Sequence, residues 1–263
     1  TLNPSGTTQV NDGYFYDLSA GTYTVTVEDI NFCSQVTNSI TIVNPDVISI
    51  LTEQSIDITC NGDEDGKVII TAGGGTGDLT YTLWPDGTTS QVNDGEFDGL
   101  VAGTYYVTVT DTNNCPEDTS SSFIITNPAL VVVDSIFSTD LLCHNDLNGT
   151  VSAYGSGGTG ALTYTLNPVG TIHVGDGLFS GLDEGTYTVT IEDINNCSVE
   201  SAPVTIVNPP GFTIQPPVST DILCNGDDNG TITVVATGGT GDITYTLNPS
   251  GTTQVNDGYF YDL

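Results

Sequence analysis

The sequence has no arginine, no methionine and one lysine, Lys67, against 33 acidic residues, which gives a formal net charge of −32 over 263 residues. A nucleic-acid binder needs cations to face the phosphates. An anionic membrane surface attracts the same kind of cationic side chain. A single lysine meets neither need, so we expect no nucleic-acid partner and no binding to an anionic membrane surface.

Long apolar runs are also missing. No stretch of about 18 apolar residues occurs, so we expect no membrane insertion. The chain opens on Thr1 without a visible signal peptide, and we expect it to be a piece of a longer polypeptide. Such acidity is typical of disordered chains, but 37% of the residues are hydrophobic and they lie in alternating runs. The charge therefore indicates a solvated surface on folded domains.

Internal repetition is the strongest signal in the sequence. The pattern Leu-x-x-Gly-Thr-Tyr-x-Val-Thr-[Val/Ile] begins at Leu18, Leu100 and Leu182, which gives a period of about 82 residues. Residues 1–18 and 246–263 are identical letter for letter. We interpret the chain as a window on a longer array: part of a repeat, two whole repeats and the beginning of another.

Each repeat is predicted to consist of short β-strands. In 129–209 we expect strands at 131–143, from Val151 onward, at 162–166, around Phe179 and Leu182, at 186–191 and at 204–207, with a polar excursion after 166. Their inward residues alternate with polar ones, and Gly, Asn and Asp turns separate them. No segment has a helical period with caps. The pattern predicts an all-β fold of tandem immunoglobulin-like β-sandwich repeats in an elongated rod. The Gly-Thr-Tyr pattern predicts a tyrosine corner, in which the hydroxyl bonds back to the backbone.

The predicted boundaries follow the repeat and its Asn-Pro pairs. We assign 1–45 to the C-terminal part of an immunoglobulin-like repeat, 46–128 and 129–209 to complete repeats, and 210–263 to the N-terminal part of a repeat of the same type as 1–45. The links at Asn-Pro are short, so adjacent repeats are expected to touch.

Two stretches carry a family resemblance: Cys224-Asn-Gly through Tyr245, with its Gly-Gly-Thr-Gly turn, and Gly21-Thr-Tyr-Thr-Val-Thr-Val-Glu-Asp through Cys33. Together they resemble the SprB-type repeats of Bacteroidetes gliding-motility adhesins, and the resemblance recurs along the chain. Gly-Gly-Thr-Gly departs from the Gly-Gly-x-x-Pro-Tyr usual in that family. The resemblance implies a very long extracellular cell-surface protein, exported by the type IX system and used in adhesion or gliding.

No catalytic set is evident, and we expect no enzyme activity. His144 aligns with Asn61 and Asn225, and His173 aligns with Gln9 and Gln91, so neither imidazole serves an activity shared by the repeats. We interpret both histidines as polar surface residues. Trp84 aligns with Asn at its equivalent positions, which predicts a surface substitution more than a ligand-stacking residue.

The six cysteines, two in each repeat, predict disulfides; zinc sites and buried free thiols are the alternatives. In immunoglobulin order the A–B turn and the F–G turn lie at opposite ends of a sandwich, roughly 30 Å apart, whereas bonded cysteines need Cα atoms within about 7 Å. End-to-end stacking instead predicts Cys60 with Cys197 of the next repeat. Cys33, Cys115, Cys143 and Cys224 are expected to find partners outside this window.

Acidic turns suggest calcium, although they lack the distal glutamate of an EF-hand. The alternative is that Asn, Asp and Gly are simply turn residues. No other cofactor is expected. The candidate calcium ligands are Asp63, Asp65, Asp227, Asp228, Glu192 and Asp193.

Short acceptor patterns predict glycosylation, with ordinary turn and strand residues as the alternative. Asn148 and Asn229 begin Asn-Gly-Thr triplets, and Asn196 begins Asn-Cys-Ser. Ser135 lies in an Asp-Ser-Ile triplet of the O-linked type.

These features favour a structural segment of a long extracellular filament or adhesin stalk, stiffened by disulfides, whose partners are the neighbouring repeats. A module that binds surface glycans and a calcium-stiffened spacer are the alternatives.

Overall fold

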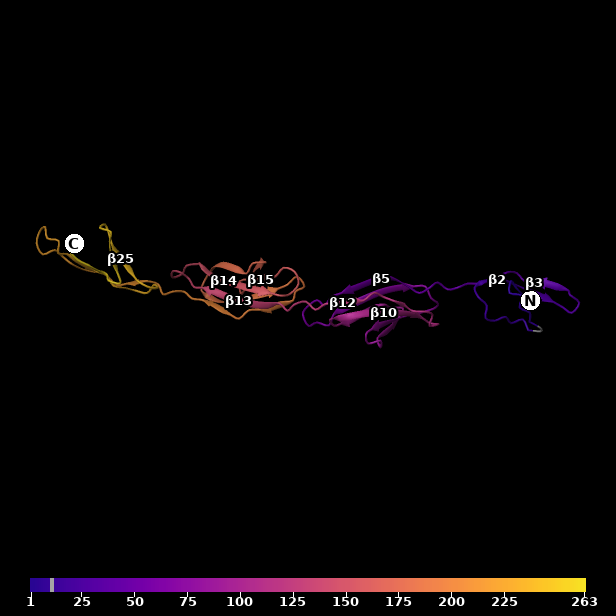
Figure 1. Cartoon of the computed structure of the whole chain (residues 1–263). Helices are drawn as coiled ribbons and strands as arrows, with labels where there is room; N and C mark the ends of the chain where they lie inside the picture. Colours follow the sequence, from indigo (N-terminus) through magenta and orange to yellow (C-terminus); the bar gives the residue numbers. More distant parts are fainter. Residues whose placement is uncertain (10–11) are drawn as a thin grey trace. The chain divides into compact units, whose positions relative to one another are not determined.

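The computed structural model describes residues 1–9 and 12–263, and all regular structure in them is β-strand (Figure 1). The all-β prediction is confirmed. No helix in this part of the chain is long and apolar enough to cross a membrane. The chain divides into two compact units: Thr1–Asp57 with Glu64–Thr126, and Ile58–Asp63 with Asn127–Leu263.

The repeat at 46–128 is a sandwich of two antiparallel sheets. One sheet has the order β5 (Ser49–Ile56), β6 (Gly66–Gly73), β9 (Glu96–Leu100). The other has the order β11 (Asp118–Thr119), β10 (Gly103–Asp111), β7 (Leu79–Trp84), β8 (Ser90–Val92), and β12 (Phe123–Ile125) also pairs with β10. In immunoglobulin nomenclature the sheets are A-B-E and G-F-C-C′.

The repeat at 129–209 has the same topology. Its first sheet is β13 (Val132–Thr139), β14 (Gly149–Ser156), β17 (Leu178–Leu182). Its second is β16 (Thr171–Val174), β15 (Thr163–Asn167), β18 (Gly185–Glu192), β19 (Ser198–Glu200), with β20 (Val204–Ile206) also on β18. The immunoglobulin-like sandwich predicted from the alternation is thus present in both complete repeats.

The end segments carry complementary parts of this topology. Residues 1–45 contain β1 (Leu2–Asn3), β2 (Gly21–Glu28), β3 (Ser34–Val36) and β4 (Ile40–Ile42). Residues 210–263 contain β21 (Thr213–Ile214), β22 (Val218–Thr220), β23 (Thr231–Thr233), β24 (Ala236–Thr237), β25 (Thr244–Leu247), β26 (Thr252–Val255) and β27 (Tyr259–Phe260).

The core of the 129–209 repeat is built from the inward residues of both sheets. Side chains that alternate along each strand point to one face, so β14, β15 and β18 each bury every second residue. The resulting cluster is almost wholly buried; it consists of Val131, Leu141, Val151, Ala153, Tyr164, Leu166, Phe179, Leu182, Tyr187, Val189, Ile191 and Ile206.

The tyrosine corner is confirmed in three repeats. The hydroxyls of Tyr23, Tyr105 and Tyr187 donate to the carbonyls four residues upstream, at 2.8, 3.0 and 3.1 Å. Each bond pins the turn between strands E and F. The polar excursion after 166 proved to be a strand, because β16 pairs with β15 from Thr163↔Val174 to Leu166↔Thr171. This segment is an edge strand whose apolar residues, Ile172 and Val174, are exposed.

Candidate functional site

The A–B turn places Cys60 at the surface of the second unit. The backbone N–H of Asp63 donates to the Cys60 carbonyl at 3.0 Å, and Gly62 between them has φ 87°. A tight turn of this kind needs positive φ at its third residue, where glycine or asparagine is tolerated. The equivalent turn at Cys143 has Asn145 there, with φ 63°. The repeated Cys-x-[Gly/Asn]-Asp sequence therefore encodes this turn.

The same turn is bound to the Asn-Pro pair that ends its repeat. The Asn61 side chain donates to the Pro128 carbonyl at 2.7 Å, and the Gly62 N–H donates to Asn127 Oδ1 at 3.1 Å. The Asn-Pro signature is thus explained by recognition of the A–B turn.

His144 is the equivalent of Asn61 in the next repeat, and its side chain bonds to the carbonyl of the equivalent proline. Its Nδ1 lies 2.9 Å from the Pro209 carbonyl, which can only accept, so Nδ1 carries the proton. The Asn145 N–H donates to Asn208 Oδ1 at 3.1 Å. His144 therefore holds a turn in place. His173 packs against Phe179, with ring centroids 4.7 Å apart.

Asp193 organises the F–G turn that presents the second cysteine. It is 3% exposed, and its carboxylate accepts backbone N–H bonds from Asn195 at 2.9 Å, Cys197 at 3.0 Å and Thr159 at 2.8 Å. Burial of the carboxyl group works against ionisation, but the three donors together outweigh it and lower the pKa of Asp193. Asp193 was a candidate calcium ligand; in the structure it is the structural centre of this turn.

The same Asp-x-x-x-Cys spacing gives the equivalent hydrogen bond in the other repeats. Asp111 Oδ1 accepts from the Cys115 N–H at 2.9 Å, and Asp29 Oδ1 accepts from the Cys33 N–H at 2.9 Å. The bond from Cys115 is the main cause of the lowered pKa of Asp111. Sequence reasoning missed this role, although the constant spacing was the signal for it.

The two turns meet in the Cys60–Cys197 disulfide. The Cα atoms are 5.6 Å apart, within the range for bonded cysteines, and 137 residues separate the two in sequence. The Asn195 side chain adds a bond to the Thr59 carbonyl at 3.3 Å. The predicted pairing is confirmed, and the alternatives of a zinc site or free thiols are wrong for this pair. Residues Ile58–Asp63, which contain this A–B turn, group with the second compact unit and not with the strands of their own repeat.

The other four cysteines form no disulfide within residues 1–9 and 12–263. Cys33, Cys143 and Cys224 are exposed, and Cys115 is half-buried. The Asp111 carboxylate beside Cys115 raises the pKa of its thiol. Partners for these four outside the window stay a prediction.

The candidate calcium ligands do not converge on one point. Across the described residues, no group of three or more His, Cys, Asp or Glu side chains is arranged to hold a metal ion. Asp227 accepts from the Asn229 side chain at 3.2 Å, and Asp228 is exposed. Calcium at these two residues, and at Asp63, Asp65, Glu192 and Asp193, stays a prediction.

The candidate glycosylation residues already have structural contacts. Asn148 Oδ1 accepts from the Leu142 N–H at 3.0 Å, and Asn229 Oδ1 accepts from the Leu223 N–H at 3.0 Å. Ser135 is half-buried on β13 opposite Tyr154. The two asparagines hold the A–B turns closed, which accounts for their recurrence without a sugar. Modification at these residues stays a prediction.

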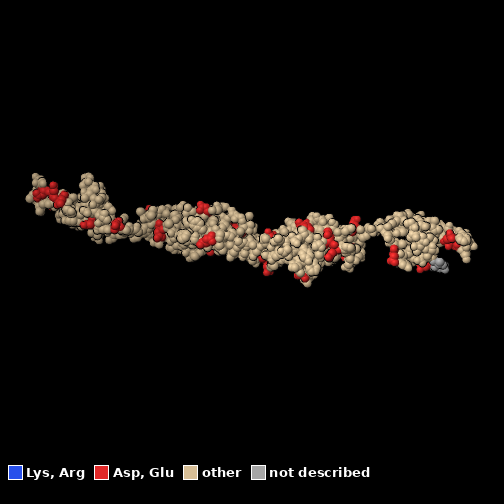
Figure 2. Space-filling model, viewed as in Figure 1, with Lys and Arg blue, Asp and Glu red and all other residues tan. Residues whose placement is uncertain are grey.

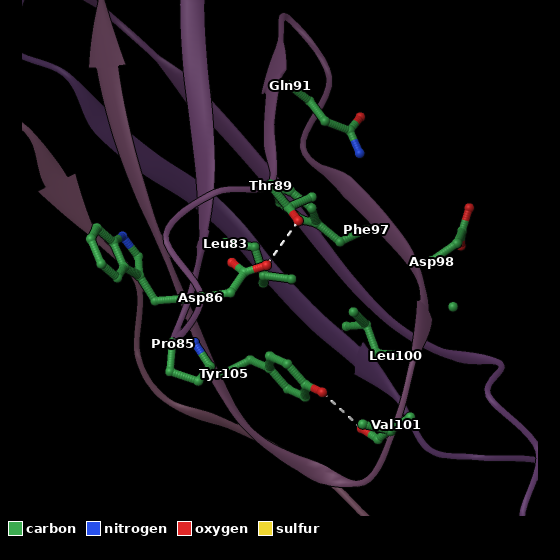
Figure 3. Close-up of a pocket in the computed structure, with 12 residues that line it drawn as sticks. Leu83, Pro85, Asp86, Thr89, Gln91, Phe97, Asp98, Leu100, Val101 and Tyr105 are labelled. Atoms are coloured by element: carbon green, nitrogen blue, oxygen red, sulfur yellow. Dashed lines mark hydrogen bonds between the residues drawn. The ribbon is translucent and has the colours of Figure 1, made fainter.

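A groove of about 440 Å³ lies in the 46–128 repeat, beside the turn between β7 and β8 (Figure 3). Its polar groups bond to each other: Asp86 accepts from the Thr89 hydroxyl at 3.0 Å, and the Tyr105 hydroxyl belongs to the tyrosine corner. The hydrogen bond from the Thr89 side chain is the main cause of the lowered pKa of Asp86. The groove therefore offers a ligand few free polar partners.

Trp84, which also lines this groove, is held by its own sheet. The indole N–H donates to the Thr108 hydroxyl at 3.1 Å, and the ring stacks on Tyr106 with centroids 5.9 Å apart. In the sibling repeat, the Asn167 side chain donates to Thr190 at 2.9 Å in the same way. Trp84 therefore keeps the side-chain N–H donor that asparagine supplies at this position in the sibling repeat. Trp84 is half-buried on a strand, and is less exposed than its alignment with asparagine suggested.

Lys67 is the single lysine among the 33 acidic residues of the chain, which has no arginine. Lys67 on β6 forms ion pairs with Glu96 and, at 2.7 Å, with Asp98. The hydrogen bond to Asp98, followed by that to Glu96, raises the pKa of Lys67 far above its ordinary value. Figure 2 shows the other acidic side chains scattered over the visible face of the chain rather than gathered in one patch.

Several solved structures resemble the chain at low identity. Sidekick-1 immunoglobulin domains 1–5 match with a TM-score of 0.38 and 11% identity, over 86% of this chain and 54% of that one. A C-terminal intimin fragment in complex with the intimin-binding domain of its translocated receptor matches with a TM-score of 0.33 and 16% identity, over 63% and 66%. A tetra-tandem repeat from the extending region of a large adhesion protein matches with a TM-score of 0.23 and 16% identity, over 92% and 73%.

The chain thus spans less than two thirds of the intimin and Sidekick-1 structures. No curated protein matches it. The SprB repeat family matches at residues 52–89 and 217–252. These two segments contain the A–B turns at Cys60 and Cys224 and the strands that follow them. The chain is therefore a tandem array of immunoglobulin-like domains in which two segments match the SprB repeat family.

Proposed function

We propose that the chain is a structural segment of a long extracellular filament or adhesin stalk on a bacterial cell surface, in which disulfides lock each repeat to the next. The observation that carries this proposal is the Cys60–Cys197 bond, which joins the A–B turn of one repeat to the F–G turn of the following one. A bond within one sandwich stabilises only that sandwich. A bond between successive repeats restrains the joint, which is what a stalk under load needs.

Three further features support this function. Disulfides persist in oxidising environments outside the cytosol. The matched SprB repeats agree with a surface location and with export by the type IX system for adhesion or gliding. The internal bonding of Asp86, Tyr105 and Trp84 leaves the groove without a prepared ligand site, which favours a structural role over glycan binding or catalysis.

Electron microscopy of the complete repeats with and without the bond tests the proposal. We expect the oxidised chain to show a narrow distribution of the angle between 46–128 and 129–209. Reductant, or the double variant Cys60→Ser/Cys197→Ser, is expected to widen it. Cys143→Ser is the matched control, because it removes an exposed thiol that forms no bond within the chain. Equal distributions in the oxidised and reduced chains would overturn the stalk function.

A further inference from the structure

The A–B turn of the 46–128 repeat contains an exposed Asn-Gly pair. Asn61 and Gly62 are both exposed, and Gly62 has φ 87°. A Cβ added at Gly62 would meet no atom within 4 Å other than those of its chain neighbours, so the space around this position is open. Glycine has no side chain to shield its backbone nitrogen. The nitrogen of Gly62 can therefore reach the side-chain carbonyl carbon of Asn61 once the turn opens.

The Asn-Pro pair that ends the repeat holds both of the groups that such a reaction needs. The Asn61 amide nitrogen donates to the Pro128 carbonyl at 2.7 Å, and the Gly62 N–H donates to Asn127 Oδ1 at 3.1 Å. The Gly62 nitrogen becomes a nucleophile only when it loses the proton that it shares with Asn127. Ring closure therefore requires these contacts to open first. Asn127 itself is protected from the same reaction, because Pro128 has no backbone N–H.

We propose that Asn61 is a site of spontaneous deamidation, which the Asn127-Pro128 pair slows and whose product breaks the contact with that pair. The Gly62 nitrogen gives its proton to hydroxide and attacks Asn61 Cγ, so that a C–N bond forms and the side-chain amide nitrogen leaves as ammonia. Water then opens the succinimide ring at either carbonyl and gives aspartate or isoaspartate. The net reaction consumes water and releases ammonia, with no oxidant or reductant.

The product cannot restore the contact with Pro128. The Pro128 carbonyl accepts hydrogen bonds and has no proton to donate, and the same holds for an ionised carboxylate. Isoaspartate also inserts the side-chain methylene into the backbone between Cys60 and Gly62, which displaces the turn. Deamidation thus releases the A–B turn from the end of its own repeat and leaves the Cys60–Cys197 bond as its covalent tie.

The sibling repeat makes the same contact without the reactive pair. There His144 and Asn145 take the places of Asn61 and Gly62, and they bond to the Asn-Pro pair of their own repeat at 2.9 and 3.1 Å. Asn145 has φ 63°, so this turn does not require glycine. Asn61→His and Gly62→Asn each introduce a sibling residue, and both remove the Asn-Gly pair while keeping a turn that the fold already uses.

A second Asn-Gly pair in the chain is an internal control. Gly149, which follows Asn148, is buried at the start of β14, and a Cβ there would lie 2.9 Å from the Leu182 carbonyl oxygen. Asn148 Oδ1 accepts from the Leu142 N–H at 3.0 Å. Ring closure at Asn148 requires the strand to leave its sheet. We therefore expect Asn148 to deamidate more slowly than Asn61.

Timed incubation of the whole oxidised chain at neutral to mildly alkaline pH tests this inference. Samples are reduced, alkylated and digested at mildly acidic pH with a protease that cuts at acidic residues. Mass spectrometry then measures the fraction of each peptide in which the asparagine amide has become a carboxyl group. We expect Asn61 to react before Asn148, at a rate that rises with pH. Gly62→Asn should leave residue 61 almost unmodified over the same time.

Two matched variants test the protection by the Asn-Pro pair. Asn127→Ala removes the acceptor of the Gly62 N–H and should accelerate deamidation of Asn61 about fivefold, the factor that corresponds to one hydrogen bond of ordinary net strength. Asn208→Ala removes the equivalent acceptor in the sibling repeat and should leave the rate at Asn61 unchanged. Trp84 fluorescence checks that the 46–128 repeat stays folded in Asn127→Ala, and the comparison of wild type with Gly62→Asn does not depend on that variant.

Hydrogen exchange at the Gly62 amide tests the effect of the product. We expect faster exchange in the aged wild type than in the fresh chain, and no change on ageing in Asn61→His. The inference would be overturned by an intact Asn61 in both wild type and Asn127→Ala, by equal rates in the two, or by unchanged Gly62 exchange after deamidation. The stalk function is tested separately through the Cys60–Cys197 bond and does not depend on this modification.

Discussion

Asp193 is the residue on which the F–G turn depends, because one carboxylate satisfies three backbone N–H groups from two different turns. Asp193→Asn retains the shape but removes the charge and replaces one acceptor oxygen with a donor. We expect a loss of about 1–3 kcal/mol in the stability of the turn, the range for leaving buried donors without their partner. Hydrogen exchange at Asn195 and Cys197 measures it.

Asp228→Asn is the matched control for that substitution, since it removes the same charge from an exposed turn residue. Unchanged exchange in Asp193→Asn would mean that the carboxylate does not organise the turn. Faster exchange in both variants would point to net charge instead.

The lowered pKa of Asp193 sets a pH dependence with a definite sign. A depressed carboxyl pKa stabilises the folded turn at pH values above the ordinary aspartate value of about 3.9, and this stabilisation is lost as the pH falls through the lower folded value. The turn should therefore stay intact through mildly acidic pH. We expect the amide proton shifts of Asn195 and Cys197 to titrate with a midpoint below 3.9. A midpoint at or above that value would contradict the hydrogen-bonded arrangement.

At the scale of the element, alternation along the strands predicted most of the fold. Strands β14, β15 and β18 have one apolar face each, so period-two patterns locate them. The edge strand β16 was missed because its alternation is short and reversed: Ile172 and Val174 are exposed, whereas His173 is half-buried. The end of β13 was placed too late, since Leu141 is buried after the strand has ended at Thr139.

At the candidate site, the sequence predicted the disulfide partner of Cys60 but not the role of Asp193. Immunoglobulin order fixes which end of the sandwich holds each turn, so the partner of Cys60 followed from topology. The role of Asp193 did not, because an acidic residue in a turn has the same appearance in sequence whether it binds a cation or backbone N–H groups.

Strand β6 carries the chain's lysine, and its setting predicts the pattern of trypsin cleavage. Lys67 lies between β5 and β9 and is paired with Glu96 and Asp98, so cleavage requires the strand to leave the sheet. We expect slow, single cleavage after Lys67. Because Cys60 and Cys197 fall on opposite sides of the cut, the two fragments should co-migrate until they are reduced.

Glu96→Gln/Asp98→Asn is expected to accelerate that cut, and Asp134→Asn on a different repeat serves as its control. Fragments that separate without reductant would show that Cys60 has no partner beyond the cut. Rapid cleavage of the wild type would show that β6 opens freely.

At the scale of the whole molecule, the Cys60–Cys197 bond couples folding across segments that are far apart in sequence. The bond closes a loop of 137 residues and so lowers the conformational entropy of the unfolded chain. In the chain-entropy model this stabilises the folded state by up to about 5 kcal/mol. Trp84 is the chain's single tryptophan, so its fluorescence reports the 46–128 repeat alone. We expect reductant to lower the denaturation midpoint seen by Trp84 in wild type and in Cys143→Ser. Cys60→Ser/Cys197→Ser should start at the lower midpoint and not respond. A reductant-dependent shift in that double variant would assign the stabilisation to another cysteine pair, and no shift in the wild type would mean that the bond restrains the joint without stabilising the repeat.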